Sequence, residues 1–467
     1  MLPDARFIIQ FHNAENEPVG PQLDISALAS PAILEELLNS LQSSSDTYQF
    51  YLQNIEVTTT LEKAVQEASH SSELVVPLTF HPESLFSVAP ATRATSCLEG
   101  HTESILCIQY SPDGSGLASG GGDACVRLWD VDTETPYKTL KGHNNWVLIV
   151  SWSPNQEFLV SAGVDGTIRV WSPVTGEQIG KSIQAHRKWV TSISWEPYHV
   201  NAESSRFASS SKDNSIKIWD RVNHNILACL SGHSAAVTKV IWGGSGLLYS
   251  SSQDRTIKVW SAENFSLLQE LKGHGHWVNH LSLSTDFALK TGFFDPSTQI
   301  QPETLEDKLK SSQKIYQKVL GKNERLVSCS DDFTLFLWSP AVTKEPITRM
   351  TGHQQLITQV LFSPDGHFCA SASNDKSIKL WEGFNGTFLC NFRSHVASVY
   401  QISWSPDSRM LVSASKDSTV KIWNVRKKKL QVDLPGHADQ VFAVDWSPDG
   451  GKMASGGRDR ILNIWRN

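Results

Sequence analysis

The sequence contains no long run of apolar residues. Hydrophobic residues make up 40% of its 467 positions, but polar and charged residues interrupt them throughout. No stretch approaches the roughly 20 residues that a helix needs to cross a membrane. Residues 1–6 also lack the basic and apolar segments of a secretory signal peptide. We therefore expect a protein with neither a membrane span nor a secretory leader.

Cysteine is scarce and has no regular spacing. The seven cysteines are odd in number, and none falls in a Cys-x-x-Cys or another metal-ligand pattern. This usage is typical of a reducing compartment, where structural disulfides are rare. The sequence therefore predicts a protein of the cytosol or the nucleus.

Motifs for catalysis are missing as well. There is no Walker loop and no Gly-x-Ser-x-Gly elbow, and the glycines at 120–122 precede Asp123 as a turn and do not form a phosphate-binding loop. We expect no enzymatic activity and no cofactor of the protein's own.

What the chain has instead is an internal repeat. Eight segments share a His, a Ser, an Asp and a Trp, and the Asp precedes the Trp by six positions every time. Such a repeat, with Gly-His early and Trp late, is typical of a propeller blade. Residues 100–467 therefore resemble a WD-repeat propeller, and eight repeats predict eight blades. The four positions are His101/Ser119/Asp123/Trp129, His143/Ser161/Asp165/Trp171, His186/Ser209/Asp213/Trp219, His233/Ser250/Asp254/Trp260, His274/Ser328/Asp332/Trp338, His353/Ser371/Asp375/Trp381, His395/Ser413/Asp417/Trp423 and His437/Ser455/Asp459/Trp465.

The shared residues have a structural role in this reading. In the second repeat, a buried His143 would link Asp165 to Ser161 and the indole N–H of Trp171. Without such partners each buried polar group would cost about 1–3 kcal/mol. Because every histidine belongs to its own blade, we favour this interpretation over a metal site or a catalytic triad.

The last repeat ends after three strands, at residue 465. Residues 84–99 form a linker in which the segment 91–98 is the natural donor of the fourth strand. Pairing the first and last segments would close the ring and remove an exposed sheet edge.

Residues 1–83 have a different pattern. Strands are predicted at 6–11, 19–25, 48–52 and 74–80, with helices from Pro31 and over 61–68. This order predicts a small α+β domain of the ubiquitin-like, β-grasp type, so that the whole protein is mainly β. The segment carries twelve acidic and two basic residues, against a net charge of +3 for the remainder. Such asymmetry indicates either separate partners or an acidic surface that favours solubility.

The fifth repeat contains an insertion at about 291–322. Pro302 stands near a helix start and Gly321 at its end, with apolar residues at helical spacing and four lysines around them. This basic amphipathic helix is either a docking element or a surface excursion that the blade tolerates.

The position three residues after each repeat histidine is expected to open the innermost strand. We predict partner binding at Trp146, Trp189, Trp277 and Leu356, because tryptophan is enriched at interface hot spots; packing between blades is the alternative. The basic run 426–429 lies in a hairpin at the opposite end of its blade, where it is solvated, contacts phosphate or forms part of a nuclear address. The eight residues at the shared position are Ser104, Trp146, Trp189, Ala236, Trp277, Leu356, Ser398 and Gln440.

The combination of an acidic β-grasp domain with an eight-repeat propeller resembles the Notchless family over essentially the whole chain. The stretches 86–93, 142–147, 194–197, 276–284 and 395–401 agree with it, as does the inserted fifth blade. The resemblance implies an assembly factor of the large (60S) ribosomal subunit in the nucleolus and nucleus, present as a monomer within a large complex. Its propeller would dock on the pre-60S particle through ribosomal proteins, other assembly factors or rRNA. The family is also linked to Notch signalling.

The resemblance further implies that the ubiquitin-like domain is bound by midasin, an AAA-type ATPase. The matching acid is Glu73, which follows Ser71 and Ser72 before the last strand. A carboxylate on an exposed loop can complete the octahedral shell of a Mg²⁺ held by another protein. Leu74 departs from the pattern, since a polar or acidic residue is expected there. We thus expect Mg²⁺ to be shared in trans through Glu73.

A competing function is that of a propeller scaffold or substrate receptor in ubiquitin-ligase or signalling complexes. Such a receptor usually carries a helical adaptor-binding motif at its N-terminus, whereas residues 1–83 indicate a β-grasp domain.

Overall fold

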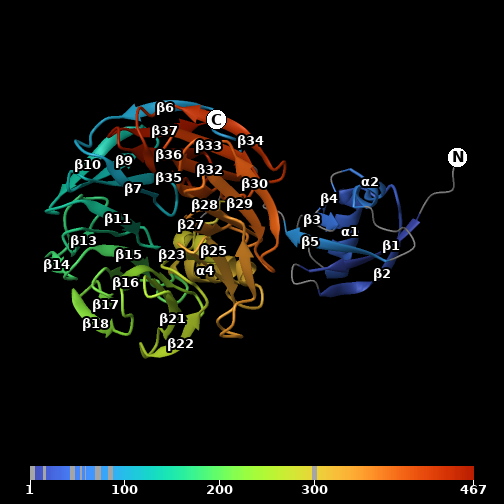
Figure 1. Cartoon of the computed structure of the whole chain (residues 1–467), viewed down its shortest axis with the longest axis horizontal. Coiled ribbons are helices and arrows are strands. Elements are labelled where there is room, and N and C mark those ends of the chain that lie inside the picture. Colours follow the sequence, from blue (N-terminus) through green and yellow to red (C-terminus); the bar gives the residue numbers. More distant parts are fainter. Residues whose placement is uncertain are drawn as a thin grey trace. The chain divides into compact units, whose positions relative to one another are not determined.

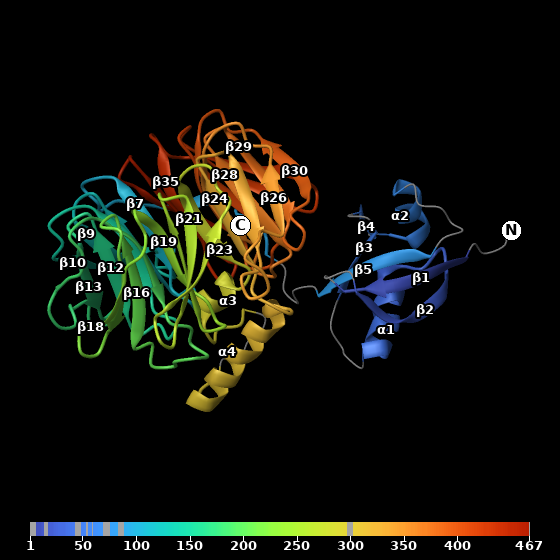
Figure 2. The ribbon, with the colours of Figure 1, turned by 60° about the horizontal axis from the view of Figure 1, so that its bottom comes forward.

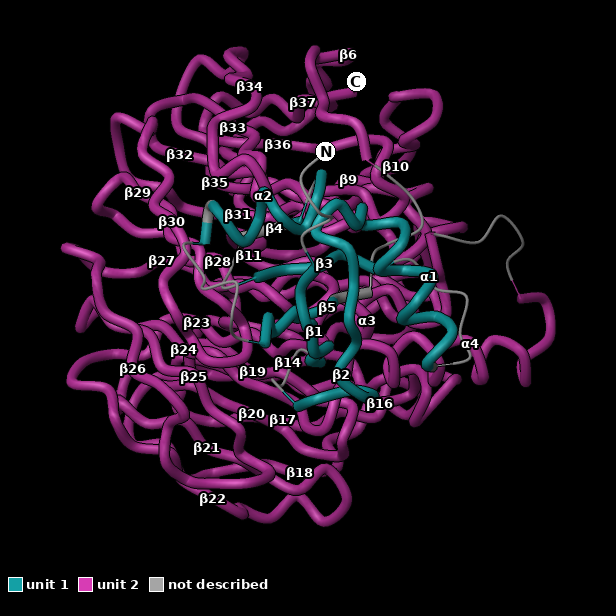
Figure 3. The backbone as a smooth tube through the Cα atoms, turned by 90° about the vertical axis from the view of Figure 1, so that its right-hand side faces the viewer, with its two compact units in different colours: residues 1–87 teal, residues 88–467 magenta. Residues whose placement is uncertain are grey.

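The computed structural model forms two compact units, residues 1–87 and 88–467 (Figure 3). Its description covers residues 6–13, 17–42, 48–52, 55–57, 59–68, 75–82, 88–296 and 302–466. Among these residues no helix is long and apolar enough to cross a membrane. All seven cysteines fall in the described part and are free thiols.

The smaller unit is a mixed five-stranded sheet with two helices (Figure 1). The strand order is β2-β1-β5-β3-β4, with β1 parallel to β5 and antiparallel to β2. This is the topology of a β-grasp fold. The elements are β1 (Arg6–His12), β2 (Pro18–Ser26), α1 (Pro31–Gln42), β3 (Tyr48–Leu52), β4 (Ile55–Glu56), α2 (Leu61–Glu67) and β5 (Val76–Pro82).

The core of this unit forms between the buried face of the sheet and the buried face of α1. Alternate residues of β1, including Ile9 and Phe11, are fully buried, and Leu34 and Leu38 of α1 pack against them in one cluster. Ile33 of the same helix is 47% exposed. Leu34 and Leu38, four positions apart, lie on the side of the helix that packs against the sheet.

The larger unit contains eight four-stranded antiparallel sheets arranged as a ring, which confirms the predicted eight-bladed propeller (Figure 1). The first strand of each blade is innermost. From inner to outer, the first four blades are β7 (Ile105–Tyr110), β8 (Gly116–Gly121), β9 (Cys125–Asp130), β10 (Thr135–Lys141); β11 (Val147–Trp152), β12 (Leu159–Gly163), β13 (Thr167–Trp171), β14 (Ile183–Gln184); β15 (Val190–Trp195), β16 (Arg206–Ser211), β17 (Ile216–Asp220), β18 (Asn225–Leu230); and β19 (Val237–Trp242), β20 (Leu247–Ser252), β21 (Thr256–Ser261), β22 (Leu267–Lys272).

The last four blades repeat the pattern. They are β23 (Val278–Leu283), β24 (Leu326–Ser330), β25 (Thr334–Trp338), β26 (Thr348–Thr351); β27 (Ile357–Phe362), β28 (Phe368–Ser373), β29 (Ser377–Glu382), β30 (Phe388–Arg393); β31 (Val399–Trp404), β32 (Met410–Ser415), β33 (Thr419–Asn424), β34 (Lys429–Pro435); and β35 (Val441–Trp446), β36 (Lys452–Gly457), β37 (Leu462–Arg466) with β6 (Arg93–Leu98).

The eighth blade joins the two ends of the propeller. Strand β6, which lies within the segment expected to close the ring, pairs antiparallel with β37, so that Leu98 faces Leu462 and Arg93 faces Arg466. The backbone N–H of Val88 also donates to Asp407 of the seventh blade at 2.8 Å. The chain therefore closes the ring through hydrogen bonds between residues more than 300 positions apart.

The innermost strand of each blade has one edge that pairs with no other strand. Side chains of neighbouring blades form hydrogen bonds with some of the backbone groups along this edge. Ser194 and Ser282 each accept a hydrogen bond from a backbone N–H of the next blade, at 2.9 and 3.2 Å. Asp445 does the same for Tyr110 at 3.0 Å and so links the eighth blade to the first. These contacts connect the blades at the axis as well as at the rim.

The segment between β23 and β24 forms two helices, α3 (Asp286–Thr291), which precedes the predicted insertion, and α4 (Leu305–Leu320), which lies within it. The predicted helix is α4, and the Thr304 hydroxyl caps it by accepting from the N–H of Asp307. Helix α3 was not predicted. It lines one end of a central cavity of about 400 Å³ to which all eight blades contribute. Gly292 then adopts φ +64° beside Pro154 of the second blade, where a Cβ would lie 2.5 Å from the Pro154 carbonyl oxygen.

Glu324 holds the insertion to the propeller. This carboxylate is 3% exposed and accepts from Gly244 N–H at 2.8 Å, from Ser245 Oγ at 2.6 Å and from Thr285 Oγ1 at 3.0 Å. The Tyr316 hydroxyl of α4 donates to it at 3.1 Å. A buried carboxylate is tolerated because its oxygens are hydrogen-bonded. The insertion is thus fixed in place on the propeller.

We predict that ring closure depends on β6. A chain without residues 1–87 should melt like the full propeller, whereas one without residues 1–98 should lose about 3 kcal/mol or more. Burial of the Leu98 side chain alone stabilises the folded state by roughly 2–3 kcal/mol. The truncation removes this contribution together with the hydrogen bonds between β6 and β37. Thermal melts of the two truncations check this, and coincident curves would contradict it.

Candidate docking face of the propeller

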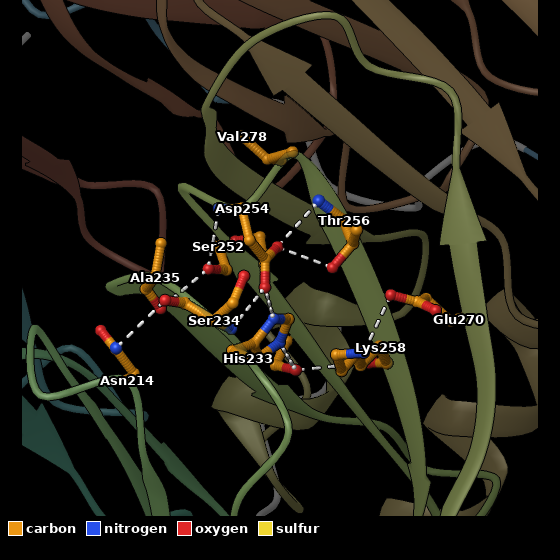
Figure 4. A network of polar contacts seen from close by, with 12 residues as sticks. Asn214, His233, Ser234, Ala235, Ser252, Asp254, Thr256, Lys258, Glu270 and Val278 are labelled. Carbon is orange, nitrogen blue, oxygen red and sulfur yellow. Dashed lines mark hydrogen bonds and ion pairs between the residues drawn. The ribbon is translucent and has the colours of Figure 1, made fainter.

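The four shared residues of each repeat form one hydrogen-bonded chain, and Figure 4 shows the contact between His233 and Asp254 of the fourth blade. His233 Nδ1 lies 2.7 Å from Asp254, and His233 Nε2 lies 2.8 Å from Ser250 Oγ. The indole N–H of Trp260 donates to the same hydroxyl at 2.9 Å. In this arrangement Trp donates to Ser, Ser donates to His, and His donates to Asp, so that no buried polar group of the tetrad is left unpaired.

The same geometry recurs in all eight blades. The His–Asp distances range from 2.7 to 3.1 Å and the Trp–Ser distances from 2.7 to 2.9 Å. In the second blade, His143 lies 2.9 Å from Asp165 and 2.8 Å from Ser161, to which Trp171 donates at 2.8 Å. Every tetrad histidine is buried. The tetrads therefore join the strands of their own blades, as predicted.

The tetrad aspartates are held in their charged form. Burial alone would raise the pKa of Asp254, but hydrogen bonds from His233 and Thr256 outweigh it and hold that pKa well below its usual range. In the third blade, burial is likewise outweighed by hydrogen bonds from Ser215 and by the interaction with His186, which lower the pKa of Asp213 to about 2. Burial lowers the pKa of His186 itself, which favours the neutral ring.

The tetrads also place a second feature, the backbone of the residue three positions after each histidine. Its carbonyl oxygen accepts from the N–H of the residue just before the tetrad Asp, as in Val164 to Trp146 at 2.9 Å and Lys212 to Trp189 at 3.0 Å. All eight blades make this bond, at 2.8–3.0 Å. Because the bond is between backbone groups, it needs no particular side chain, and the fold leaves this position free to vary.

The three tryptophans at this position are exposed. Trp146 is 52%, Trp189 40% and Trp277 46% exposed, although tryptophan is usually well buried. The ammonium of Lys212 lies 3.7 Å from the centre of the Trp189 ring, a contact that leaves much of the ring open to solvent. Leu356, by contrast, is half-buried. The blades thus expose the tryptophans at one face, while Leu356 contributes less surface there.

The residue after each tetrad Asp is a further site on this face that the sequence reading missed. All eight have a φ between +58° and +71°, the left-handed region, and only one of them is glycine. Phe333 is the largest, with φ +66° and 43% exposure. A bulky residue is costly in that conformation, so its presence points to a use for the side chain. The constant Asp-to-Trp spacing could have revealed this variable position. We call this face, comprising Trp146, Trp189, Trp277 and Phe333, the docking face.

The predicted metal ligand lies outside the described residues, as do its neighbours Ser71, Ser72 and Leu74. Within the part of the chain that the structure describes, no group of three or more His, Cys, Asp or Glu side chains could hold a metal ion. Glu73 therefore stays a prediction. The basic run begins in the turn between β33 and β34 and ends at Lys429, the first residue of β34.

Comparison with known families matches both units. The NLE (NUC135) domain matches residues 7–65. The WD domain, G-beta repeat, matches seven segments, and the unmatched residues 262–343 include β22 of the fourth blade and the first three strands of the blade with the insertion. The matched segments are residues 92–130, 134–172, 177–220, 224–261, 344–382, 386–424 and 427–466. Fold and repeats together define a WD-repeat propeller protein with an NLE domain.

Similar proteins of known name identify the family within this class. The Notchless protein homolog of Arabidopsis thaliana is 49% identical over 82% of this chain and 81% of its own length. Ribosome assembly protein 4 of Saccharomyces cerevisiae is 47% identical over 80% of this chain and 77% of its own length. Protein Notchless of Drosophila melanogaster is 44% identical over 75% of this chain and 73% of its own length. The chain belongs to the Notchless family.

A designed protein shares the propeller architecture. The crystal structure of the computationally designed Ika8 protein matches with a TM-score of 0.63 at 22% identity, covering 80% of this chain and 100% of that one. At this identity the likeness concerns the fold alone.

We predict that the docking face binds partners without stabilising the blades. Trp146→Ala, Trp189→Ala and Trp277→Ala should each reduce recovery of co-purifying partners, with stability changes of about 0.5 kcal/mol or less, as for exposed sites. Phe333→Gly should also reduce recovery while keeping stability, because glycine adopts positive φ freely. Leu356→Ala is the matched control with a smaller expected loss of recovery. A large drop in melting temperature for the tryptophan variants would identify them as packing residues.

The tetrads predict acid sensitivity. Asp213→Asn should cost about 1.5–3 kcal/mol at pH 7, the range for a hydrogen bond to a charged group. Because the folded pKa of Asp213 lies below its unfolded value, this advantage of the wild type is present above about pH 4. It should be lost as the pH falls toward about 2. Denaturant unfolding of both proteins at pH 7, 4 and 3 measures the difference, and a difference that stays constant would be the contrary result.

Proposed function

We propose that this protein is a non-catalytic assembly factor of the large ribosomal subunit whose propeller docks on pre-60S particles. The observation that carries the proposal is the docking face, where the fold exposes three tryptophans at a position whose backbone role needs none of them. The identity of 47% to Ribosome assembly protein 4 supports the choice of particle.

The chemistry of the repeats supports a role in binding over one in catalysis. The histidine–aspartate pairs lie inside the blades, and each His also engages a serine that is bonded to a tryptophan, so that no nucleophile faces solvent there. In this function the protein works in the nucleolus and nucleus, as a monomer within a large complex. A role in Notch signalling belongs to the same proposal, supported by the names of the relatives from Drosophila and Arabidopsis.

We propose that midasin binds the N-terminal domain. Its acidic character, with twelve acids among residues 1–83, suits a contact through a shared cation. In this proposal Glu73 supplies one carboxylate oxygen to a Mg²⁺ that midasin holds, and ATP-driven movement then remodels the particle and releases the factor. Mg²⁺ requires near-octahedral oxygen ligands at short distances, so that a single carboxylate can decide the affinity.

Sedimentation tests the function. A tagged chain in a nuclear extract should co-sediment with precursors of the large subunit in a sucrose gradient, and the combined variant of Trp146, Trp189 and Trp277 to Ala should move to the light fractions. A wild-type chain that sediments only with ubiquitin-ligase subunits would instead support the receptor function.

The contact with midasin yields a separate prediction for Glu73. Glu73→Gln should keep the shape and lose binding of the full chain to the metal-binding domain of midasin, and Glu73→Asp should also fail because its reach is shorter by one methylene. Glu36→Gln, an exposed acid on α1, is the matched control and should bind normally. Pull-downs with and without EDTA measure this. Undiminished binding by Glu73→Gln would move attention to Glu56 or Glu83.

A further inference from the structure

Helix α4 has two different sides. One side packs on the propeller, where the Tyr316 ring stacks on His199 of the third blade with the ring centres 4.3 Å apart. Ser312 is buried beside it, and the Ser311 hydroxyl donates to the backbone oxygen of Phe293 at 3.2 Å. The helix is therefore held rigidly along this side, and Figure 2 shows it standing out from the strands of the ring.

The other side carries a row of lysines. Lys310, Lys314 and Lys318 are exposed and follow one another at intervals of four residues, so that they lie on one line about 6 Å apart along the helix axis. None of the three forms an ion pair or hydrogen bond with any residue that the structure describes. Lys308 differs, because its ammonium lies over the Phe293 ring at 4.8 Å. We call Lys310, Lys314 and Lys318 the lysine row.

The helix itself does not account for this row. Like charges four residues apart repel each other and destabilise a helix. The helix dipole favours a cation in the last turn, which explains Lys318 but not Lys310 or Lys314. The acids of α4, Glu306 and Asp307, lie in the first turn. A fixed line of unpaired cations is therefore suited to an external polyanion that neutralises it.

The surroundings of the row indicate which polyanion fits. Between the lysines the exposed side presents Gln313 and Gln317 and no aromatic ring, while the one tyrosine of α4 is buried against the propeller. Proteins that bind single strands use aromatic rings on which bases stack. Cations and amides without rings instead suit the phosphates of a duplex, which is recognised by shape and backbone.

We propose that the lysine row of α4 binds the phosphate backbone of double-stranded RNA. The choice of RNA over another polyanion rests on the proposed function, since the partner there is a pre-ribosomal particle. The three ammonium groups contact successive phosphates, while the buried side of α4 keeps their spacing fixed. This contact adds affinity that does not depend on sequence and lies apart from the docking face.

The test is binding of the full chain to a fluorescent RNA hairpin with a stem of about 16 base pairs, a length that duplex-binding domains span. Anisotropy is measured from 50 to 200 mM KCl for the wild type and for Lys310→Gln/Lys314→Gln/Lys318→Gln. Since each neutralised phosphate contributes about 0.9 to the slope of log K against log salt, the variant should lose up to about 3 from that slope. At 50 mM salt it should bind at least about tenfold more weakly. Glutamine keeps the helix, because its helix propensity resembles that of lysine.

The control removes the same charge elsewhere. Lys141→Gln/Lys181→Gln/Lys344→Gln changes three exposed lysines on separate blades and should bind like the wild type. If both triple variants bound the RNA equally weakly, the loss of affinity would follow from net charge alone, and the proposal would be overturned. No binding to the stem, tighter binding of a single strand of the same length, or a row-dependent preference for an acidic peptide would overturn it too. Sedimentation with pre-ribosomes reports the proposed function independently, because the docking face is intact in both triple variants.

Discussion

The hydrogen-bonded chain from Trp through Ser and His to Asp is the interaction on which the propeller depends. A four-stranded sheet of this size buries little apolar surface alone, and its stability depends on packing against neighbouring blades. Within each blade the tetrad joins the first loop to the second and third strands through buried groups, such as Ser250 with no exposed surface. Each blade thereby keeps the same shape, so that eight copies fit around one axis.

This regular frame also determines where variation is possible. Because the tetrad holds the loops, the carbonyl three residues after the histidine and the left-handed turn after the aspartate recur in every blade. Both are backbone requirements, and neither demands the same side chain in every blade. Tryptophans at the first position and Phe333 at the second use that freedom on the same face. The residues proposed to bind partners are thus different from those that stabilise the blade, within a single repeat of about 40–45 residues.

The insertion follows another rule. It breaks the fifth repeat between β23 and β24 but preserves the tetrad of that blade, since His274 still lies 3.1 Å from Asp332. Its helices are held by contacts to other blades, through Glu324 and the Tyr316–His199 stack. Loop insertions of this kind are tolerated because closure entropy rises slowly with length. The blade therefore keeps its four strands, while α4 presents a charged surface outside the repeat.

The sequence by itself determined the repeat, the tetrads, the strand from Tyr48 to Leu52 and the helix that became α4, because local periodicity and fixed spacing specify these. It did not determine α3, whose six residues are too few for a helical pattern. Nor could it tell which apolar side chains face solvent: tertiary packing exposes Trp277, half-buries Leu356 and places Phe333 in a left-handed turn. These outcomes depend on neighbours far apart in sequence, and only the closed ring brings those neighbours together.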